Sequence, residues 1–241
     1  MIKLGISGFC GKMGQRIVAL AKDDKNLKII FGLEDKNHPQ IGKMVEGVKV
    51  TADRSQIKDC DCLIDFSSPQ ALPENIRCLR QFKKTAVIGT TGLNQDDLAI
   101  IKDAAKDIAV VFSPNMSIGV NVLFRLLKEA SKALKGYAAA IEETHHIHKK
   151  DSPSGTAKEI ARIINQYGFE IKTEDIGSKR QGEVVGDHKV IFASQVDRLE
   201  LFHSAKTRDI FVQGALAAAS WVVNKPAGLY SIEDVLFDEK D

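Results

Sequence analysis

Short apolar runs and amphipathic stretches alternate along the first half of the chain. Five runs that end in small or polar residues predict strands, at residues 2–7, 27–33, 62–66, 85–88 and 109–112. Three stretches with helical spacing of their apolar positions predict helices, at residues 12–21, after Pro69 and at 94–106. Strands and helices that alternate in this way form parallel βαβ units. We therefore predict an α/β domain with a doubly wound parallel sheet, which would bind a ligand at the carboxyl edge of its strands.

The pattern changes after residue 117. A long helix is predicted at residues 118–134, followed by a strand at 137–143 and a helix at 157–167. Strand-like runs follow at residues 189–194, 199–204 and 209–212, and the short gaps between them indicate antiparallel pairing. These elements predict a smaller α+β domain with a mostly antiparallel sheet. An alanine-rich stretch from Gly214 predicts a helix, and residues 228–230 are expected to return to the first domain.

Composition narrows the class of protein. The chain has 241 residues, of which 44% are hydrophobic and 27% are charged, as is typical of a soluble globular protein. A dispersed net charge of +2 argues against a nucleic-acid binder. No apolar run approaches the length of a membrane span, and no secretory signal pattern is present. Cys10, Cys60, Cys62 and Cys78 lack disulfide-like or zinc-like spacing, so we expect reduced thiols and a cytoplasmic protein.

The loop after the first strand carries the glycine pattern Gly8-Phe9-Cys10-Gly11-Lys12-Met13-Gly14. Between a strand and a helix, such glycines let the backbone turn tightly, approach a pyrophosphate and bring the helix against the strand. Glu34 ends the second strand, where an acidic residue would hold the adenosine ribose. A plain turn at a helix start is the alternative, but strand, helix and Glu34 together favour a Rossmann-like dinucleotide site. At the middle glycine position we expect Cys10 to be a tolerated small side chain rather than a redox thiol.

Asp35 directly follows Glu34 and bears on the choice of nucleotide. Its carboxylate would repel the 2′-phosphate of NADPH, so we expect NADH to be favoured. Lys36 could offset this repulsion, which leaves the use of both nucleotides open.

A helix start with the chemistry of an anion site follows in the second half of the chain. Pro153 cannot continue a strand ladder, and Ser154 is a favoured N-cap. Gly155 and Thr156 therefore lie in the first turn of the helix. The N–H groups of that turn and the positive end of the helix dipole would favour a carboxylate or phosphate.

Three histidines and two lysines precede this helix start, at positions 145, 146, 148, 149 and 150. His145 and His148 have the i, i+3 spacing of a helical metal site. However, the chain has no His-Glu-x-x-His pattern, and the apolar run before these residues predicts a strand, on which His145 and His146 face opposite ways. We therefore favour acid–base or anion-binding chemistry and predict no metal.

Several motifs in order along nearly the whole chain resemble the 4-hydroxy-tetrahydrodipicolinate reductase (dihydrodipicolinate reductase) family. The most specific is Glu143-Thr144-His145-His146 with Lys149-x-Asp151-Ser152-Pro153-Ser154-Gly155-Thr156-Ala157. The others are the glycine loop, Asp65-Phe66-Ser67, Gly89-Thr90-Thr91-Gly92, residues 113–121, Arg180-Gln181-Gly182, Gly186-Asp187-His188, Gly214-Ala215-Leu216 and residues 228–230. Ser152 stands where many members carry alanine, a change that we expect to be harmless.

The resemblance implies an enzyme that reduces a small dicarboxylate, 4-hydroxy-tetrahydrodipicolinate, with NADH or NADPH in lysine and diaminopimelate biosynthesis. His145 and Lys149 match the family's catalytic residues, which handle the proton. His146, Gly155 and Thr156 match residues that hold the substrate carboxylates. The dinucleotide contacts match Gly8, Phe9, Cys10, Gly11, Lys12, Met13, Glu34, Asp35, Phe66, Gly89, Thr90, Thr91, Ser113, Pro114, Asn115 and Met116. Some members have an arginine at the position of Asp35 for the NADPH phosphate, which puts a preference for NADPH in doubt.

The resemblance also implies roles for the two domains. Residues 1–116 with 214–241 would bind the dinucleotide, and residues 117–213 would bind substrate and assemble a homotetramer through their sheet. Hinge closure would bring the two ligands together. Arg180 could contact a charge, but a solvated loop arginine is the favoured interpretation.

Three other functions stay open on the sequence alone. The first is another dehydrogenase of the aspartate-derived pathway, such as one that acts on aspartate semialdehyde or homoserine. The reaction of aspartate semialdehyde would need a nucleophilic cysteine in the middle of the chain, and none lies beyond Cys78. A dinucleotide sensor would keep the glycine loop but would not need His145 and Lys149. A metal hydrolase built on the three histidines would retain zinc or manganese on purification.

Overall fold

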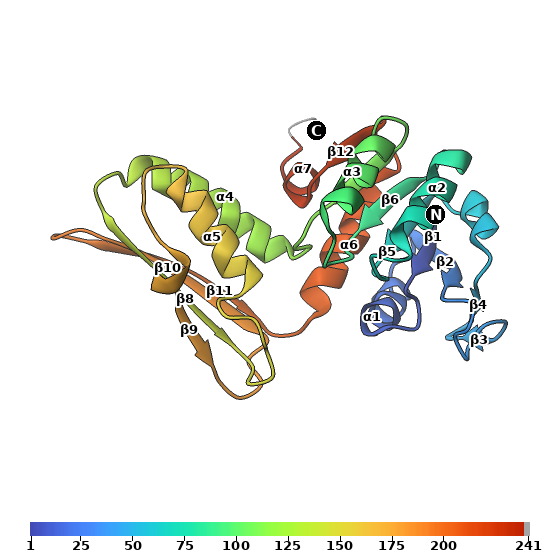
Figure 1. The fold of residues 1–241 in the computed structure, drawn as a ribbon, viewed down its shortest axis with the longest axis horizontal. Helices are drawn as coiled ribbons and strands as arrows, with labels where there is room; N and C mark the ends of the chain where they lie inside the picture. The colour runs from blue at the N-terminus through green and yellow to red at the C-terminus, as the bar shows by residue number, and fades with distance from the viewer. Residues whose placement is uncertain (239–241) are drawn as a thin grey trace. The chain divides into compact units, whose positions relative to one another are not determined.

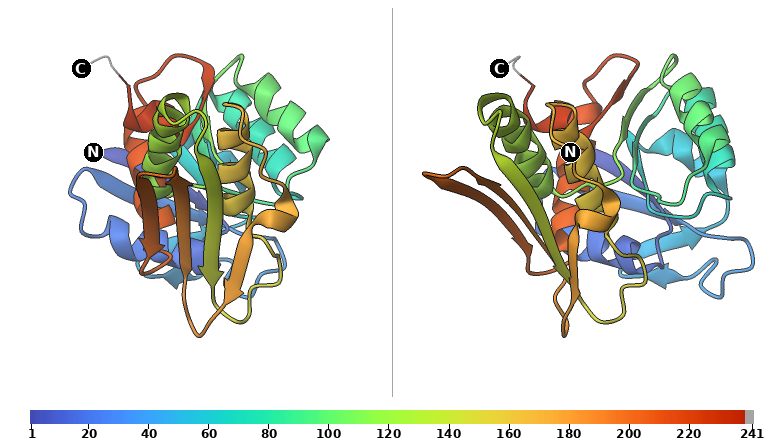
Figure 2. Two further views of the ribbon diagram at one scale, coloured as in Figure 1. Left: turned by 90° about the vertical axis from the view of Figure 1, so that its left-hand side faces the viewer. Right: turned by 60° about the vertical axis from the view of Figure 1, so that its left-hand side comes forward.

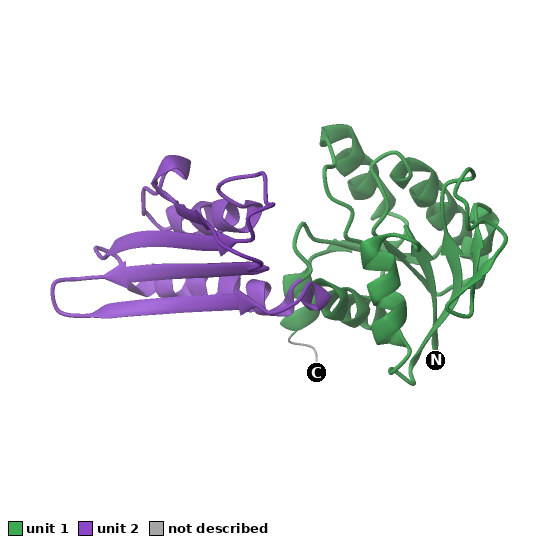
Figure 3. Ribbon diagram, turned by 90° about the horizontal axis from the view of Figure 1, so that it is seen from below, with its two compact units in different colours: residues 1–116, 211–241 green, residues 117–210 purple. Residues whose placement is uncertain are grey.

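The structure, a computed structural model, describes residues 1–238. Contacts divide the chain into two compact units, which Figure 3 shows in green and purple. Unit 1 comprises Met1–Met116 and the segment from Phe211 onward, and unit 2 comprises Ser117–Ile210. The chain therefore leaves unit 1 once, forms unit 2 and returns.

Unit 1 is built on an eight-stranded sheet with the strand order β12-β7-β6-β5-β1-β2-β4-β3 (Figure 1). Its strands are β1 (Ile2–Ser7), β2 (Leu27–Leu33), β3 (Met44–Val45), β4 (Val48–Thr51), β5 (Cys62–Asp65), β6 (Thr85–Ile88), β7 (Ala109–Phe112) and β12 (Gly228–Tyr230). All neighbours pair parallel except β3 with β4. The order runs outward from β1 through β2 on one side and through β5 on the other. The predicted doubly wound parallel sheet is confirmed, with its reversal point between β1 and β5.

Helices cover both faces of this sheet because both faces of a parallel strand are apolar. One face carries α1 (Lys12–Ala21) and α6 (Asp209–Val222), and the other carries η1 (Arg54–Asp59), α2 (Leu72–Phe82) and α3 (Gln95–Ala104). Successive strand residues point to opposite faces, so Ile64 joins the core under α1 and α6, and Leu63 joins the core under α2 and α3. A short helix, α7 (Ile232–Leu236), follows β12.

The strand predicted at residues 209–212 is wrong, because this segment is the first turn of α6. The fully buried residues of α6 recur at helical spacing: Val212, Ala215, Ala218, Ala219 and Val222. The hydroxyl of Thr207 accepts a hydrogen bond from the Asp209 N–H at 3.2 Å at the helix start. Val212 belongs to this buried helix face, and Phe211 packs partly buried against the same core of unit 1.

Unit 2 has a four-stranded sheet in the order β11-β10-β8-β9, with two long helices on one face (Figures 1 and 2). Its elements are α4 (Ile118–Ala133), β8 (Ala138–His145), α5 (Gly155–Asn165), η2 (Thr173–Asp175), β9 (Gly177–Arg180), β10 (Gly186–Ala193) and β11 (Arg198–Ala205). Apolar residues of α4 and α5 pack on Ile141, Val190 and Phe192 of the sheet. The pairs β8–β10 and β10–β11 are antiparallel, so the predicted mostly antiparallel sheet is confirmed.

Two local features of unit 2 bear on function. Strand β9 pairs parallel with β8 and was not predicted, because the segment Gly177–Arg180 contains no apolar residue. Helix α5 begins at Gly155, directly after the N-cap Ser154, whose hydroxyl accepts from the Ala157 N–H at 3.2 Å. The predicted cap is confirmed, and α5 starts just after the histidine-rich end of β8.

Candidate active site

The loops after β1 and β5 meet where the strand order of unit 1 reverses. Gly8 has a φ of +76°, which L side chains rarely adopt, and a Cβ there would lie 2.5 Å from the Phe66 carbonyl oxygen. A Cβ on Gly14 would lie 2.3 Å from the Gly8 carbonyl oxygen. Helix α1 therefore starts directly against this loop, with Gly11 as its N-cap. The N-terminal N–H groups of α1 and the glycine loop form a cradle of the kind that binds phosphate groups.

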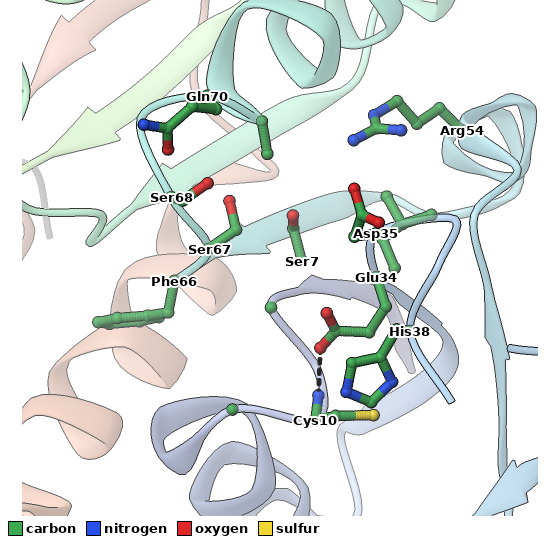
Figure 4. A pocket seen from close by; sticks show the side chains of 14 residues that line it. Ser7, Cys10, Glu34, Asp35, His38, Arg54, Phe66, Ser67, Ser68 and Gln70 are labelled. Atoms are coloured by element: carbon green, nitrogen blue, oxygen red, sulfur yellow. Dashed lines mark hydrogen bonds between the residues drawn. The ribbon is translucent and has the colours of Figure 1, made fainter. Parts of the chain in front are cut away.

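A cleft of about 430 Å³, which we call the β2-side cleft, lies beside the glycine loop (Figure 4). Glu34 and Asp35 follow β2 and line it, together with Cys10. Glu34 Oε1 accepts a hydrogen bond from the Cys10 N–H at 2.6 Å. Burial and the Glu34 carboxylate raise the pKa of the Cys10 thiol, which argues against a reactive thiolate at this position.

A second cleft of about 270 Å³, the β6-side cleft, lies at the loops after β5, β6 and β7. Predicted cofactor residues form most of its lining: Met13, Phe66, Gly89, Thr90, Thr91, Ser113, Pro114 and Met116. Phe66 and Ser67 line both clefts. Loops that follow β1, β2, β5, β6 and β7 of unit 1 thus bring most of the predicted cofactor residues together at one sheet edge.

A buried carboxylate fixes the loop residues between the two clefts. Asp65 is 1% exposed, and its Oδ1 accepts from the Ser67 N–H at 2.9 Å, from Ser67 Oγ at 2.5 Å and from Thr90 Oγ1 at 3.0 Å. Its Oδ2 accepts from Asn75 Nδ2 at 2.8 Å. Ser67 lines both clefts and Thr90 lines the β6-side cleft, so the hydrogen bonds to Asp65 fix the positions of residues that line both clefts.

Three predicted cofactor residues line neither cleft. The Phe9 side chain is fully buried in the core of unit 1, so the loop presents only the Phe9 backbone. Lys12 is exposed at the first residue of α1, and the Asn115 carbonyl oxygen accepts from Ser113 Oγ at 2.9 Å. Any contact of these residues with a dinucleotide would involve the backbone or a long, mobile side chain.

Strand β8 of unit 2 ends in a chain of interacting charged and titratable groups. Glu143 and His145 are two residues apart on the strand and so face the same side, where Glu143 Oε2 is hydrogen-bonded to His145 Nδ1. Glu143 is 2% exposed, and its Oε1 accepts from Arg180 Nη1 at 3.0 Å and from the Ser154 N–H at 3.3 Å. Arg180 ends β9 and lies opposite His145 in the strand register. Arg180 is therefore a partner of a buried carboxylate rather than a solvated loop arginine.

The pKa values in this cluster shift for identifiable reasons. Burial would raise the pKa of Glu143, but hydrogen bonds from Arg180 and His145 outweigh it and lower the pKa. Burial lowers the pKa of His145, Glu143 opposes this shift, and the positive charges of Lys149 and Arg180 add to it. At neutral pH Glu143 is therefore ionised and His145 is neutral. The His145 Nδ1 proton is then directed at Glu143, which leaves a lone pair on Nε2.

The start of α5 lies beside these groups. Nε2 of His188, on β10, is 3.1 Å from Ser154 Oγ, and the His145 and His188 ring centroids are 5.1 Å apart. Burial, with a smaller contribution from His145, lowers the pKa of His188 to about 3, so His188 is neutral. A Cβ built on Gly155 would meet no atom within 4 Å. The first turn of α5, at Gly155 and Thr156, is therefore open to a ligand.

The loop between β8 and α5 carries the remaining predicted residues. Lys149 Nζ lies 2.8 Å from Asp151 Oδ1, and the Lys149 side chain is 22% exposed. Nδ1 of His146 is buried and has no hydrogen-bond partner among residues 1–238. His148 is exposed. Within the described part of the chain, no group of three or more His, Cys, Asp or Glu side chains could hold a metal ion.

Sequence reasoning did not assign roles to Glu143, Arg180, His188 and Arg54. The i, i+2 spacing of Glu143 and His145 on a predicted strand was the one available indication. Arg180 lies in the motif Arg180-Gln181-Gly182, but nothing in the polar sequence of β9 indicates that its charge contact is Glu143. His188 is in a predicted motif, but its contact with Ser154 depends on the antiparallel pairing of β8 with β10.

These features define a class of enzyme, the pyridine-nucleotide-dependent oxidoreductases. Unit 1 is a Rossmann-type sheet with clefts at its loops, and unit 2 places Glu143, His145 and Arg180 beside the start of α5. Comparisons with known proteins agree and narrow the class. The family model of the dihydrodipicolinate reductase N-terminus matches residues 2–116, and that of the dihydrodipicolinate reductase C-terminus matches residues 119–236. The chain belongs to the dihydrodipicolinate reductase family, whose enzymes depend on a pyridine nucleotide.

Individual relatives cover nearly the whole chain. The 4-hydroxy-tetrahydrodipicolinate reductases of Trichlorobacter lovleyi and Nitrosomonas eutropha are 38% and 39% identical to it, over 98% of this chain and 99% and 98% of those proteins. The structure of dipicolinate-bound dihydrodipicolinate reductase from Paenisporosarcina sp. has a TM-score of 0.83 at 24% identity, and covers 97% of this chain and 99% of that one. This likeness confirms the fold. No helix within residues 1–238 is long and apolar enough to cross a membrane.

Proposed function

We propose that this chain reduces 4-hydroxy-tetrahydrodipicolinate to tetrahydrodipicolinate in lysine and diaminopimelate biosynthesis, with His145 and Lys149 as the proton-handling residues. Relatives that carry this reductase name at 35–39% identity support the reaction. The observation that carries the proposal is the contact of His145 with Glu143, which is itself bound by Arg180 and by the N-cap of α5.

The nucleotide would bind unit 1. Gly8 and Gly14 let the loops after β1 and β5 and the start of α1 approach one another closely, since a Cβ at either position would overlap backbone atoms. The N–H groups at the start of α1 suit a pyrophosphate. The β2-side cleft, with Glu34 and Asp35, suits the adenosine, and the β6-side cleft, with Thr90 and Ser113, suits the nicotinamide. When bound, the nicotinamide supplies the hydride. We assign a preference for NADH to Asp35, because this exposed carboxylate would repel a 2′-phosphate.

Proton delivery would use Lys149 and His145. The net reaction adds one hydride and one proton to the substrate and releases water from the hydroxylated form. Lys149 forms an ion pair with Asp151, which orients its ammonium group, a three-proton donor. Neutral His145 presents Nε2 as an acceptor, which can hold a substrate N–H or take up a proton for delivery. Glu143 fixes the tautomer and orientation of the His145 ring in the way that a carboxylate orients a catalytic histidine.

The substrate carboxylates would bind at the start of α5. The first turn at Gly155 and Thr156 is open and carries the positive end of the helix dipole. Nδ1 of His146 is buried without a partner among the described residues, as expected of a group that awaits a ligand. A dicarboxylate meets a helix start, a lysine and an imidazole here, which together offer it hydrogen-bond donors and the positive charge of Lys149.

We further assign the chain to a homotetramer in the cytoplasm. The edge strand β11 exposes Leu199 and Phe202, and Val196 in the turn before it is 91% exposed, which suits a subunit contact on the sheet of unit 2. All four cysteines are free, as in reducing compartments. Light scattering of the purified protein would give the mass, and a monomer would contradict the assembly.

A coupled assay tests the reaction. Pyruvate and aspartate semialdehyde are condensed by a synthase in the cuvette while the absorbance of NADH or, separately, NADPH is followed. We expect substrate-dependent oxidation that falls by about 100-fold or more in His145→Ala and in Lys149→Ala, since each loses proton transfer. No oxidation of either nucleotide by the folded wild type would overturn the proposal and favour a dinucleotide sensor.

A further inference from the structure

Arg54 brings an uncommitted cation to the β2-side cleft. It is the first residue of η1, it is half-buried, and its guanidinium lies on the wall of the cleft near Asp35 (Figure 4). Arg54 forms no ion pair within residues 1–238. The Glu74 carboxylate is instead bound by Arg77, at 2.6 Å and 3.0 Å. Nothing in the described chain therefore neutralises the positive charge of Arg54 by direct contact.

A buried network anchors this side chain. Arg54 Nε donates to Asn75 Oδ1 at 2.9 Å, and Asn75 is fully buried. Asn75 Nδ2 in turn donates to Asp65 Oδ2 at 2.8 Å and to Ser7 Oγ at 2.9 Å. Nε of the guanidinium is thus hydrogen-bonded to the buried Asn75, while the two Nη groups stay available. An arginine held in this way loses little conformational entropy when it binds a ligand.

The charge of the cleft makes such a cation significant. Glu34 and Asp35 line the same cleft, and both would repel a 2′-phosphate on the adenosine ribose. Glu34 is engaged by the Cys10 N–H through Oε1, whereas Asp35 is exposed. A guanidinium with two free Nη groups matches the oxygens of a phosphate and would offset the repulsion from Asp35.

We propose that Arg54 binds the adenosine 2′-phosphate of NADPH and so allows the chain to use both nucleotides despite Asp35. The proposal rests on the nucleotide-dependent function assigned above and deepens it, since it names the residue that sets nucleotide choice. An alternative is that the face of the guanidinium packs on the adenine, which is common to NADH and NADPH. The two roles differ in one measurable respect, because only the first depends on the 2′-phosphate.

Calorimetry with nucleotide fragments tests the proposal without catalysis. Adenosine 2′,5′-bisphosphate and adenosine 5′-monophosphate are titrated into the wild type, Arg54→Gln and Arg54→Lys. We expect Arg54→Gln to weaken binding of the 2′,5′-bisphosphate by about tenfold or more and to leave the 5′-monophosphate within about twofold, with Arg54→Lys in between. The wild-type preference for the 2′,5′-bisphosphate should also fall as salt is raised.

Lys58→Gln is the matched control, because Lys58 is an exposed cation on the same element, η1, and lines neither cleft. It should bind both fragments as the wild type does. Steady-state kinetics should agree: Arg54→Gln raises the KM for NADPH about tenfold, with kcat and the KM for NADH unchanged.

Equal weakening of both fragments in Arg54→Gln would overturn the proposal in favour of an adenine contact, and unchanged binding of both would remove Arg54 from the site. Failure of the proposed reaction is distinguishable. Suppose that fragment binding differs between the wild type and Arg54→Gln as expected, but the wild type oxidises neither nucleotide. This result would contradict the reductase function and support the role of Arg54.

Discussion

Each unit of the molecule buries one carboxylate near its candidate site, and the two are held in opposite ways. Asp65 in unit 1 accepts hydrogen bonds from neutral donors, namely Ser67, Thr90 and Asn75. Glu143 in unit 2 is bound by a guanidinium and an imidazole, both of which can carry charge. Burial is nearly the same, at 1% and 2% exposure. The difference therefore lies in the chemistry of the partners.

This difference separates two tasks. Neutral donors around Asp65 fix the positions of loop residues, so the carboxylate acts as a rigid support for the β2-side and β6-side clefts. Around Glu143, the charge of Arg180 keeps the carboxylate ionised, and the protonation of His145 responds to it. We infer that unit 1 binds through shape and backbone, whereas unit 2 handles protons. Substitutions at the two carboxylates should then have different kinetic signatures.

Glu143→Gln should have the largest effect on catalysis. The amide no longer stabilises the His145 tautomer, so kcat should fall by about 100-fold or more, within the range that general acid–base catalysis supplies. Because Glu143 raises the pKa of His145, its loss should also move the acid limb of the kcat profile to lower pH. The KM for NADH should stay within about twofold, since unit 1 is unchanged.

Glu142→Gln is the control for this substitution. Glu142 is the preceding residue on β8, is exposed, and contacts Lys189 at 3.5 Å. We expect wild-type kinetics, because an exposed ion pair contributes little. A folded Glu143→Gln variant with kcat and pH profile like those of the wild type would show that the charged cluster has no catalytic part.

Asp65→Asn should instead act on nucleotide binding and stability. An amide can accept through only one oxygen, so its NH₂ group would face a donor in the Asn75 or Ser67 contacts. We expect a loss of about 2 kcal/mol in the free energy of unfolding and a rise of about tenfold in the nucleotide KM. The pH profile of kcat should not move, which distinguishes Asp65 from Glu143.

Asp61→Asn serves as the control. Asp61 is exposed and directly precedes the first residue of β5, whereas Asp65 is the last residue of that strand. Urea unfolding and steady-state kinetics check both variants. The comparison of the two carboxylates would break down if Asp65→Asn shifted the pH profile as Glu143→Gln does.

Elements with strong local patterns were predictable, and elements fixed by tertiary contacts were not. The parallel strands of unit 1 are apolar on both faces, and the Ser154 cap is a local interaction, so both were available from the sequence. Residues 209–212 were not, because a three-residue apolar run is too short to distinguish the period of a strand from that of a helix. Strand β9 has no apolar residue at all and forms only because β8 offers an edge to pair with.

The site followed the same division. Motifs predicted roles for the glycines, the histidines and Lys149, and these roles stay predictions. The partners of Glu143 were not, because Arg180 lies 37 positions away and reaches Glu143 only through the β8–β9 pairing. Arg54 likewise reaches the β2-side cleft from a 3-10 helix that the hydrophobic pattern did not predict. Phe9 shows the converse: it lies in a binding motif, yet its side chain is in the core.

Acid should destabilise the protein through the unit 2 cluster. His188 has a folded pKa of about 3, well below the unfolded value near 6.5, so the unfolded state binds the extra proton between these values. Stability is therefore lost as the pH falls below about 6.5, by about 2 kcal/mol between pH 7 and pH 5 from this residue. His188→Gln should flatten the dependence, as measured by urea unfolding at several pH values. An unchanged slope would assign acid sensitivity to other groups.

Gly186→Ala should give a smaller effect that isolates the position of His145. A Cβ on Gly186 would lie 3.0 Å from His145 Nε2 and 3.3 Å from its Cδ2, so the ring must shift by a few tenths of an ångström. Glu143 holds the other side of the ring, and we expect kcat to fall by about threefold to tenfold with little change in either KM. Gly177→Ala, in strand β9 on the other side of β8, would place its Cβ 3.5 Å from the nearest atom and should behave like the wild type. Equal kinetics in the two variants would mean that catalysis tolerates displacement of His145, and the proton-handling role of unit 2 would then rest on Lys149 alone.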